Sequence, residues 1–89
     1  MKKGLSLKTR KTLETLQTGG LVSKNIRIHG RRTSVRLEPG MWDALYEIST
    51  VEQCSVHEIC SGVDSIKEDT TSFTAALRVF LMQYYKESN

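Results

Sequence analysis

The feature that most constrains this chain is a stretch of alternating side chains that ends at its single proline. In a predicted strand over about residues 31–38, polar positions alternate with less polar ones from Arg32 onward, and Pro39 follows directly. A period of two is typical of a β-strand with one buried and one exposed face. The inward positions would be Thr33, Val35 and Leu37, and the outward positions Arg32, Ser34 and Arg36. A single strand cannot satisfy its own backbone hydrogen bonds, so it needs a second strand.

Two sources can supply that second strand. A hairpin across His29 and Gly30 would bring residues 25–28 back along the first strand, with Ile26 and Ile28 on the inward face. The same strand of a second copy could instead pair antiparallel about a two-fold axis. Both pairings can coexist in a wider sheet. Because a chain of 89 residues buries a limited core alone, we expect the intermolecular pair at the centre, in an intertwined homodimer.

Helical periodicity follows the strand. Pro39 suits the first position of a helix, and apolar side chains at helical spacing predict a helix over about 39–52. Ser55 and Glu58 have the spacing of a capping box, which predicts a second helix over about 55–67. A third apolar stripe predicts a C-terminal helix over about 72–86. The fold class is therefore mainly α with one short β-ribbon, in a domain that spans residues 25–89.

Charge is distributed very unevenly along the chain. Residues 1–36 contain ten Lys or Arg and one acid, whereas residues 37–89 contain three Lys or Arg and nine acids. A basic third beside an acidic remainder is typical of proteins that bind a polyanion. Ser, Thr, Lys and Gly dominate residues 1–24, where we expect a flexible basic arm with at most a nascent helix over 7–17.

Several classes of protein are disfavoured. No apolar run is long enough to cross a bilayer, and the N-terminus lacks a secretory core, so we expect a cytoplasmic, nucleoid-associated protein without a membrane partner. Phosphate loops, zinc-protease motifs and nucleophile elbows are absent, so we expect neither an enzyme nor a cofactor. Cys54, His57 and Cys60 have suggestive spacing, but His29 on the strand is the only spare fourth ligand. We therefore expect no metal, a buried Cys60 and an exposed His57.

The segments RRTSVRLEPGMWDALYEI, CSVHEICSGV and SFTAALRVFLMQYY resemble the ribbon-helix-helix DNA-binding family. The resemblance covers roughly residues 25–86 and is greatest for small bacterial members with a third C-terminal helix. Gln53 and Cys54 stand where members often have glycine before the second helix. The resemblance implies that two chains pair their strands into a ribbon that enters the DNA major groove.

The resemblance also implies roles for individual residues. Arg32, Ser34 and Arg36 take the base-contacting positions, which agrees with the alternation, and the opening of the second helix takes a phosphate. The predicted phosphate contacts are Ser55, Val56, Arg31, Arg27 and Lys24.

The predicted function is that of a sequence-specific regulator of transcription, a repressor that binds double-stranded DNA as a homodimer or as a higher oligomer of dimers. One alternative is an antitoxin or adaptor that binds an unidentified protein through its arm or third helix. Another is a non-specific nucleoid or RNA-binding protein.

Overall fold

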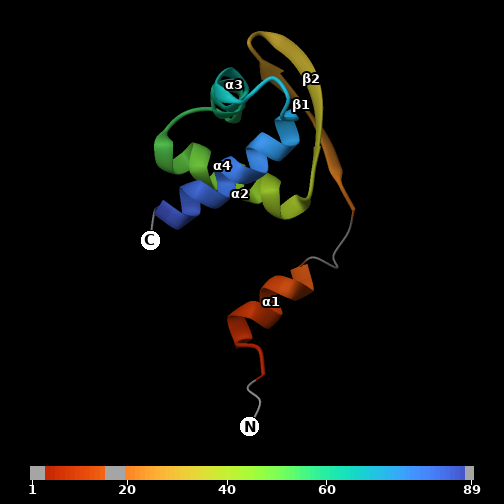
Figure 1. Ribbon diagram of the computed structural model, residues 1–89, viewed down its shortest axis with the longest axis vertical. Helices are drawn as coiled ribbons and strands as arrows, with labels where there is room; N and C mark the ends of the chain where they lie inside the picture. Colours follow the sequence, from red (N-terminus) through yellow and green to blue (C-terminus); the bar gives the residue numbers. More distant parts are fainter. Residues whose placement is uncertain (1–3, 16–19, 88–89) are drawn as a thin grey trace.

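The computed structural model describes residues 4–15 and 20–87. The elements, in chain order, are α1 (Leu7–Thr15), β1 (Val22–Ile28), β2 (Arg31–Leu37), α2 (Pro39–Glu52), α3 (Val56–Ile66) and α4 (Phe73–Glu87). Figure 1 shows a two-stranded sheet beside α2, α3 and α4, with α1 apart from them. The fold class is confirmed as mainly α with a short β-ribbon, and within this chain the strand pair is β1 with β2.

The two strands form an antiparallel hairpin that turns at His29 and Gly30. Both turn residues have positive φ, 53° and 78°, as a two-residue turn of type I′ requires. The register sets Ile26 opposite Thr33 and Ile28 opposite Arg31. Because opposite residues share a face, the two isoleucines lie on the inward face of β2, as the hairpin alternative predicts.

The first strand begins earlier than the sequence pattern indicates. β1 starts at Val22, so the expected boundary between arm and domain, after residue 24, falls inside this strand. The Trp42 indole of α2 donates a 2.8 Å hydrogen bond to the Val22 carbonyl oxygen. This bond holds the start of β1 against α2, and β1 therefore pairs with β2 from Val22 onward.

One apolar core joins the sheet to the three helices. The inward face of the hairpin meets α2, α3 and α4, whose apolar positions recur at helical spacing. Its buried members are Ile26, Ile28, Val35, Leu37, Trp42, Leu45, Ile48, Val56, Cys60, Val63, Leu77 and Leu81. None of the described helices is both long and apolar enough to cross a bilayer.

The turn between α2 and α3 does without glycine. Gln53 adopts the left-handed conformation, with φ 55° and ψ 44°, at the end of α2. Its N–H and that of Cys54 reach back to the carbonyl oxygens of Thr50 and Ser49, at 3.4 and 3.1 Å. A residue with a Cβ adopts this conformation at a cost of about 1–2 kcal/mol, so the chain reaches the same helix ending at some expense in stability.

Within the arm, α1 has a local cap. The Ser6 hydroxyl accepts a 3.1 Å hydrogen bond from the Thr9 backbone N–H, which satisfies one free donor at the start of the helix. The nascent helix expected over 7–17 is observed from Leu7 to Thr15, and residues 16 and 17 lie outside the described part of the chain.

Candidate nucleic-acid interface

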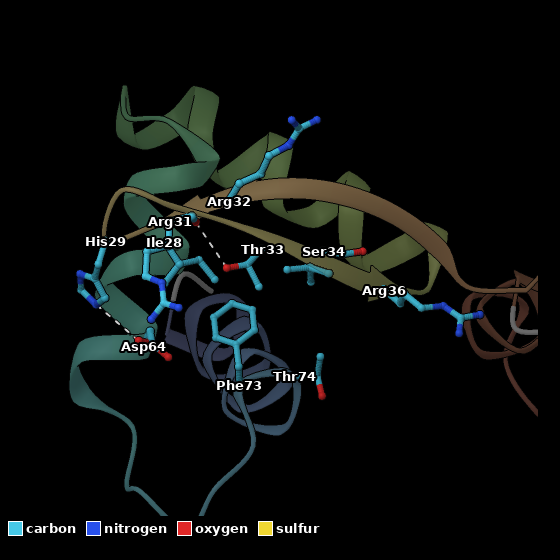
Figure 2. Close-up of a pocket in the computed structure, with 11 residues that line it drawn as sticks. Ile28, His29, Arg31, Arg32, Thr33, Ser34, Arg36, Asp64, Phe73 and Thr74 are labelled. Carbon is cyan, nitrogen blue, oxygen red and sulfur yellow. Dashed lines mark hydrogen bonds and ion pairs between the residues drawn. The ribbon is translucent and has the colours of Figure 1, made fainter.

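The outward face of the hairpin carries six exposed polar side chains and no acid. Three cross-strand pairs make up this exposed face: Ser23 with Arg36, Asn25 with Ser34, and Arg27 with Arg32. The three predicted base-contacting residues on β2 therefore lie on one face and have β1 side chains beside them. Figure 2 shows the Arg32 side chain pointing away from Phe73 and α4.

Packing on the other face explains this exposure. Val35 and Leu37 are 3% and 0% exposed beneath the helices, so their neighbours at alternate positions, Ser34 and Arg36, must face outward. Thr33 lies on the inward face as predicted, yet it is exposed. Its hydroxyl donates a 3.3 Å hydrogen bond to the Arg31 carbonyl oxygen, so this position contributes little to the core.

Among the residues that the structure describes, the arginines of the exposed face have no carboxylate partner. The two salt bridges among the described residues join His29 to Asp64 and Arg78 to Glu38. Glu38 follows β2 directly, but its carboxylate binds the Arg78 guanidinium of α4 at 2.9 Å. A hydrogen bond with its own backbone, and then the hydrogen bond and charge of Arg78, lower the pKa of Glu38. The acid that directly follows β2 is therefore bound to α4.

A cavity of about 860 Å³ opens at the outer edge of β2. Residues of β2 form one side of this cavity, and Asp64, Phe73 and Thr74 lie on the other (Figure 2). Arg31 lines this cavity together with Arg32 and Arg36. The strand register sets Arg31, a predicted phosphate contact, opposite Ile28 on the inward face, whereas Arg32 and Arg36 belong to the exposed face.

The opening of α3 has the capping box that the sequence predicts. The Ser55 hydroxyl accepts from the Glu58 N–H at 3.0 Å, and the Ser55 N–H donates to the Glu58 carboxylate at 2.8 Å. The Val56 side chain is buried, so only its backbone N–H is available to a ligand at this helix end. Glu58 places a negative charge at the predicted phosphate position.

Lys24 lies on the inward face, away from the predicted site. Its ammonium lies 4.8 Å from the ring centre of Tyr46 and 5.4 Å from that of Trp42. It also donates a 3.1 Å hydrogen bond to the Tyr46 hydroxyl. These contacts tie the start of β1 to α2 by cation–π attraction, so Lys24 has a structural partner that the sequence analysis missed.

A row of side chains on α3 covers the outer edge of β1. His57 Nδ1 accepts from the Arg27 N–H at 2.9 Å, and the Ser61 hydroxyl accepts from the His29 N–H at 3.0 Å. Ser65 lies 3.2 Å from the His29 imidazole. We call His57, Ser61 and Ser65 the edge row. Sequence reasoning missed it, although its spacing of four residues places all three on one side of a helix.

The cysteines behave as predicted where the structure describes them. Cys60 is fully buried, and burial raises the pKa of its thiol to about 11. His57 is exposed and faces β1. Within residues 4–15 and 20–87, no three His, Cys, Asp or Glu side chains are arranged to hold a metal ion.

Comparison with known families agrees with this architecture. A model of the ribbon-helix-helix domain matches residues 21–85, from just before β1 to within α4. Comparison with curated proteins and with solved structures gives no match. The match spans the hairpin, α2, α3 and most of α4, and the chain therefore belongs to the ribbon-helix-helix domain family, a family of DNA-binding regulators.

Proposed function

We propose that this protein is a sequence-specific regulator of transcription that binds double-stranded DNA as a homodimer and represses by occupying a promoter. The observation that carries the proposal is the exposed face of the hairpin in a ribbon-helix-helix domain, whose three arginines have no carboxylate partner within residues 4–15 and 20–87. A two-stranded ribbon fits the major groove of B-DNA, where base pairs are distinguishable by their donors and acceptors.

The open edge of β2 favours the pairing of two copies. The Arg27 N–H points away from β2 and is donated to His57 of α3. Because Arg32 stands directly opposite Arg27 in an antiparallel pair, the backbone N–H and C=O of Arg32 point away from β1. Ser34 and Arg36, at alternate positions, do the same. β2 of a second copy would satisfy these groups about a two-fold axis and fill the cavity beside Phe73.

Base contacts follow from the side chains on the central strands. Arg32 and Arg36 have the donors for paired hydrogen bonds to guanine O6 and N7, and Ser34 can bond to several bases. Two-fold symmetry then predicts a palindromic operator, with adjacent dimers on longer sites.

Phosphate contacts are proposed for the flanks of the ribbon. The His57–Arg27 bond holds the start of α3 next to β1, so Arg27 and the backbone N–H of Val56 lie on the same flank. The Ser55 N–H is donated to Glu58, so the Glu58 carboxylate must move away before a phosphate binds there. Arg31 stays a predicted contact at the hairpin end. Lys24 must leave the rings of α2 before it reaches a phosphate.

The test is the effect of Arg36→Ala on operator variants. We expect a loss of about 1–3 kcal/mol that is confined to particular base pairs, measured by titration onto labelled promoter fragments with excess random duplex. Lys86→Ala, which removes one cation from α4, is the matched control and should leave sequence preference unchanged. Equal binding of every operator variant by Arg36→Ala and the parent would exclude direct base contact by Arg36.

A protein-binding role is the second candidate, favoured by exposed apolar side chains on α3 and α4. Ile66, Val79 and Met82 are 83%, 54% and 57% exposed. Deletion of residues 1–20 separates arm-dependent binding from DNA binding, because a ribbon that contacts bases keeps its sequence preference without the arm.

A further inference from the structure

The base contacts proposed for β2 leave open where β1, the other strand of the hairpin, lies in the DNA complex. We propose that β1 lies over the sugar-phosphate rim of the major groove and that its exposed side chains, Ser23, Asn25 and Arg27, bind DNA phosphates. The inference rests on the proposed function, because it assumes that two copies pair through β2.

The order of strands follows from which edge is free. The edge row of α3 accepts the outward N–H groups of Arg27 and His29, so a second chain cannot add to β1 there. The edge of β2 borders an open cavity instead. Pairing through β2 therefore produces a four-stranded sheet with the two β2 strands at its centre and a β1 strand on each side.

The width of this sheet decides what β1 touches. Neighbouring strands lie about 4.8 Å apart, so the two outer strands of four are separated by about 14 Å. The major groove is about 12 Å wide, which admits the central pair and leaves the outer strands above the groove walls. The walls are the phosphate backbones, so β1 meets phosphate oxygens while β2 meets base edges.

The side chains of β1 suit that position. Ser23, Asn25 and Arg27 are exposed and share a face with the three base-contacting residues of β2. Each side chain ends in a donor that can form a hydrogen bond to a phosphate oxygen. The bond from the Arg27 N–H to His57 holds the strand against α3, and thereby holds the Arg27 side chain at a fixed distance from the centre of the sheet.

A matched pair of cross-strand neighbours tests the inference. Arg27→Gln and Arg32→Gln remove the same charge at positions directly opposite each other. The probes are a duplex selected from a random-sequence library and a scrambled duplex of the same composition, titrated from about 50 to 200 mM salt. We expect Arg27→Gln to weaken both duplexes equally, about three- to tenfold, and to make the salt slope of the dimer shallower by about two.

Arg32→Gln and Asn25→Ala distinguish base contacts from phosphate contacts. Arg32→Gln should weaken the selected duplex more than the scrambled one, whereas Asn25→Ala should weaken both equally without changing the salt slope, because it removes no charge. A change in sequence preference with Arg27→Gln, or no effect of either β1 variant, overturns the rim position of β1 while Arg32→Gln still reports on base contact. Failure of the parent to prefer the selected duplex overturns the proposed function and this inference together.

Discussion

The two outer edges of the hairpin differ in what covers them. At β1, side chains of α3 accept the outward backbone N–H groups of Arg27 and His29. At β2, the backbone groups of Arg32, Ser34 and Arg36 face a cavity that Phe73 and Thr74 border. Both strands have seven residues and the same burial pattern along the chain, so the difference comes from the helices and not from the strands.

This difference shows how a small fold directs its own assembly. An exposed strand edge recruits any other strand, and proteins restrict that reaction by covering or blunting edges. Here one edge is covered by polar side chains on a helix. The other edge is left open beside arginines that disfavour random aggregation. A second copy is then limited to one pairing partner, which fixes the order of strands in the proposed dimer.

The largest effect is expected when the open edge is blocked. Ser34→Pro removes an outward N–H and places a ring where a partner strand would lie, so we expect the dimer and operator binding to be lost while the monomer stays folded. Thr33→Pro is the matched control. Its N–H faces β1, so proline there removes a hydrogen bond of the ladder and should destabilise the hairpin itself. Sedimentation equilibrium and circular dichroism measure the two outcomes, and a dimeric Ser34→Pro protein would contradict pairing through β2.

Labelling of Cys60, which lies on the buried face of α3, reports on how firmly α3 covers the edge of β1. Because burial raises the pKa of this thiol to about 11 from 9.0, its thiolate fraction at pH 8 falls about a hundredfold, and its contact with solvent requires α3 to move. We expect a thiol reagent to label Cys54 at least a hundredfold faster than Cys60, as mass spectrometry of time points would show. Equal rates would mean that α3 leaves β1 readily. The raised pKa implies that Cys60 stays neutral up to about pH 11.

The smallest effects distinguish members of the edge row. Ser61→Ala leaves the His29 N–H without its acceptor, at a cost of about 1 kcal/mol that the better helix propensity of alanine partly offsets. Ser65→Ala makes the same chemical change four residues later, where the hydroxyl meets only an exposed imidazole. We expect Ser61→Ala to lower the free energy of unfolding and Ser65→Ala to leave it unchanged or raise it slightly, in urea titrations. Equal effects would contradict the role of Ser61 at the strand edge.

Much of this architecture is predictable from local pattern. Alternation at residues 31–37, Pro39 and the Ser55–Glu58 capping box locate β2, α2 and the start of α3 because each is a short-range signal. The first half of β1 gives no such signal, since its inward positions are the exposed residues Val22 and Lys24. The Val22 carbonyl oxygen accepts from the Trp42 indole, and the Lys24 ammonium lies over the Tyr46 ring.

The candidate site is predictable to a lesser extent. Alternation alone places Arg32, Ser34 and Arg36 on one face, and the hairpin register is needed to set Asn25 and Arg27 beside them. Arg31 and Lys24 lie on the inward face, where tertiary packing decides their surroundings. The edge row depends on α3 lying along β1, a relation between segments about 30 residues apart that no local pattern encodes.

The turn at His29 and Gly30 has a consequence for how the protein would respond to its own abundance. A ribbon that needs two chains to make its first strand pair cannot fold before it assembles. In this chain the first pair closes across two residues, so a folded monomer can exist before it meets a second copy. Below the dimer dissociation constant, promoter occupancy would then rise with the square of protein concentration. Promoter occupancy would thus respond more steeply to expression of the protein than it would for a protein that binds as a monomer.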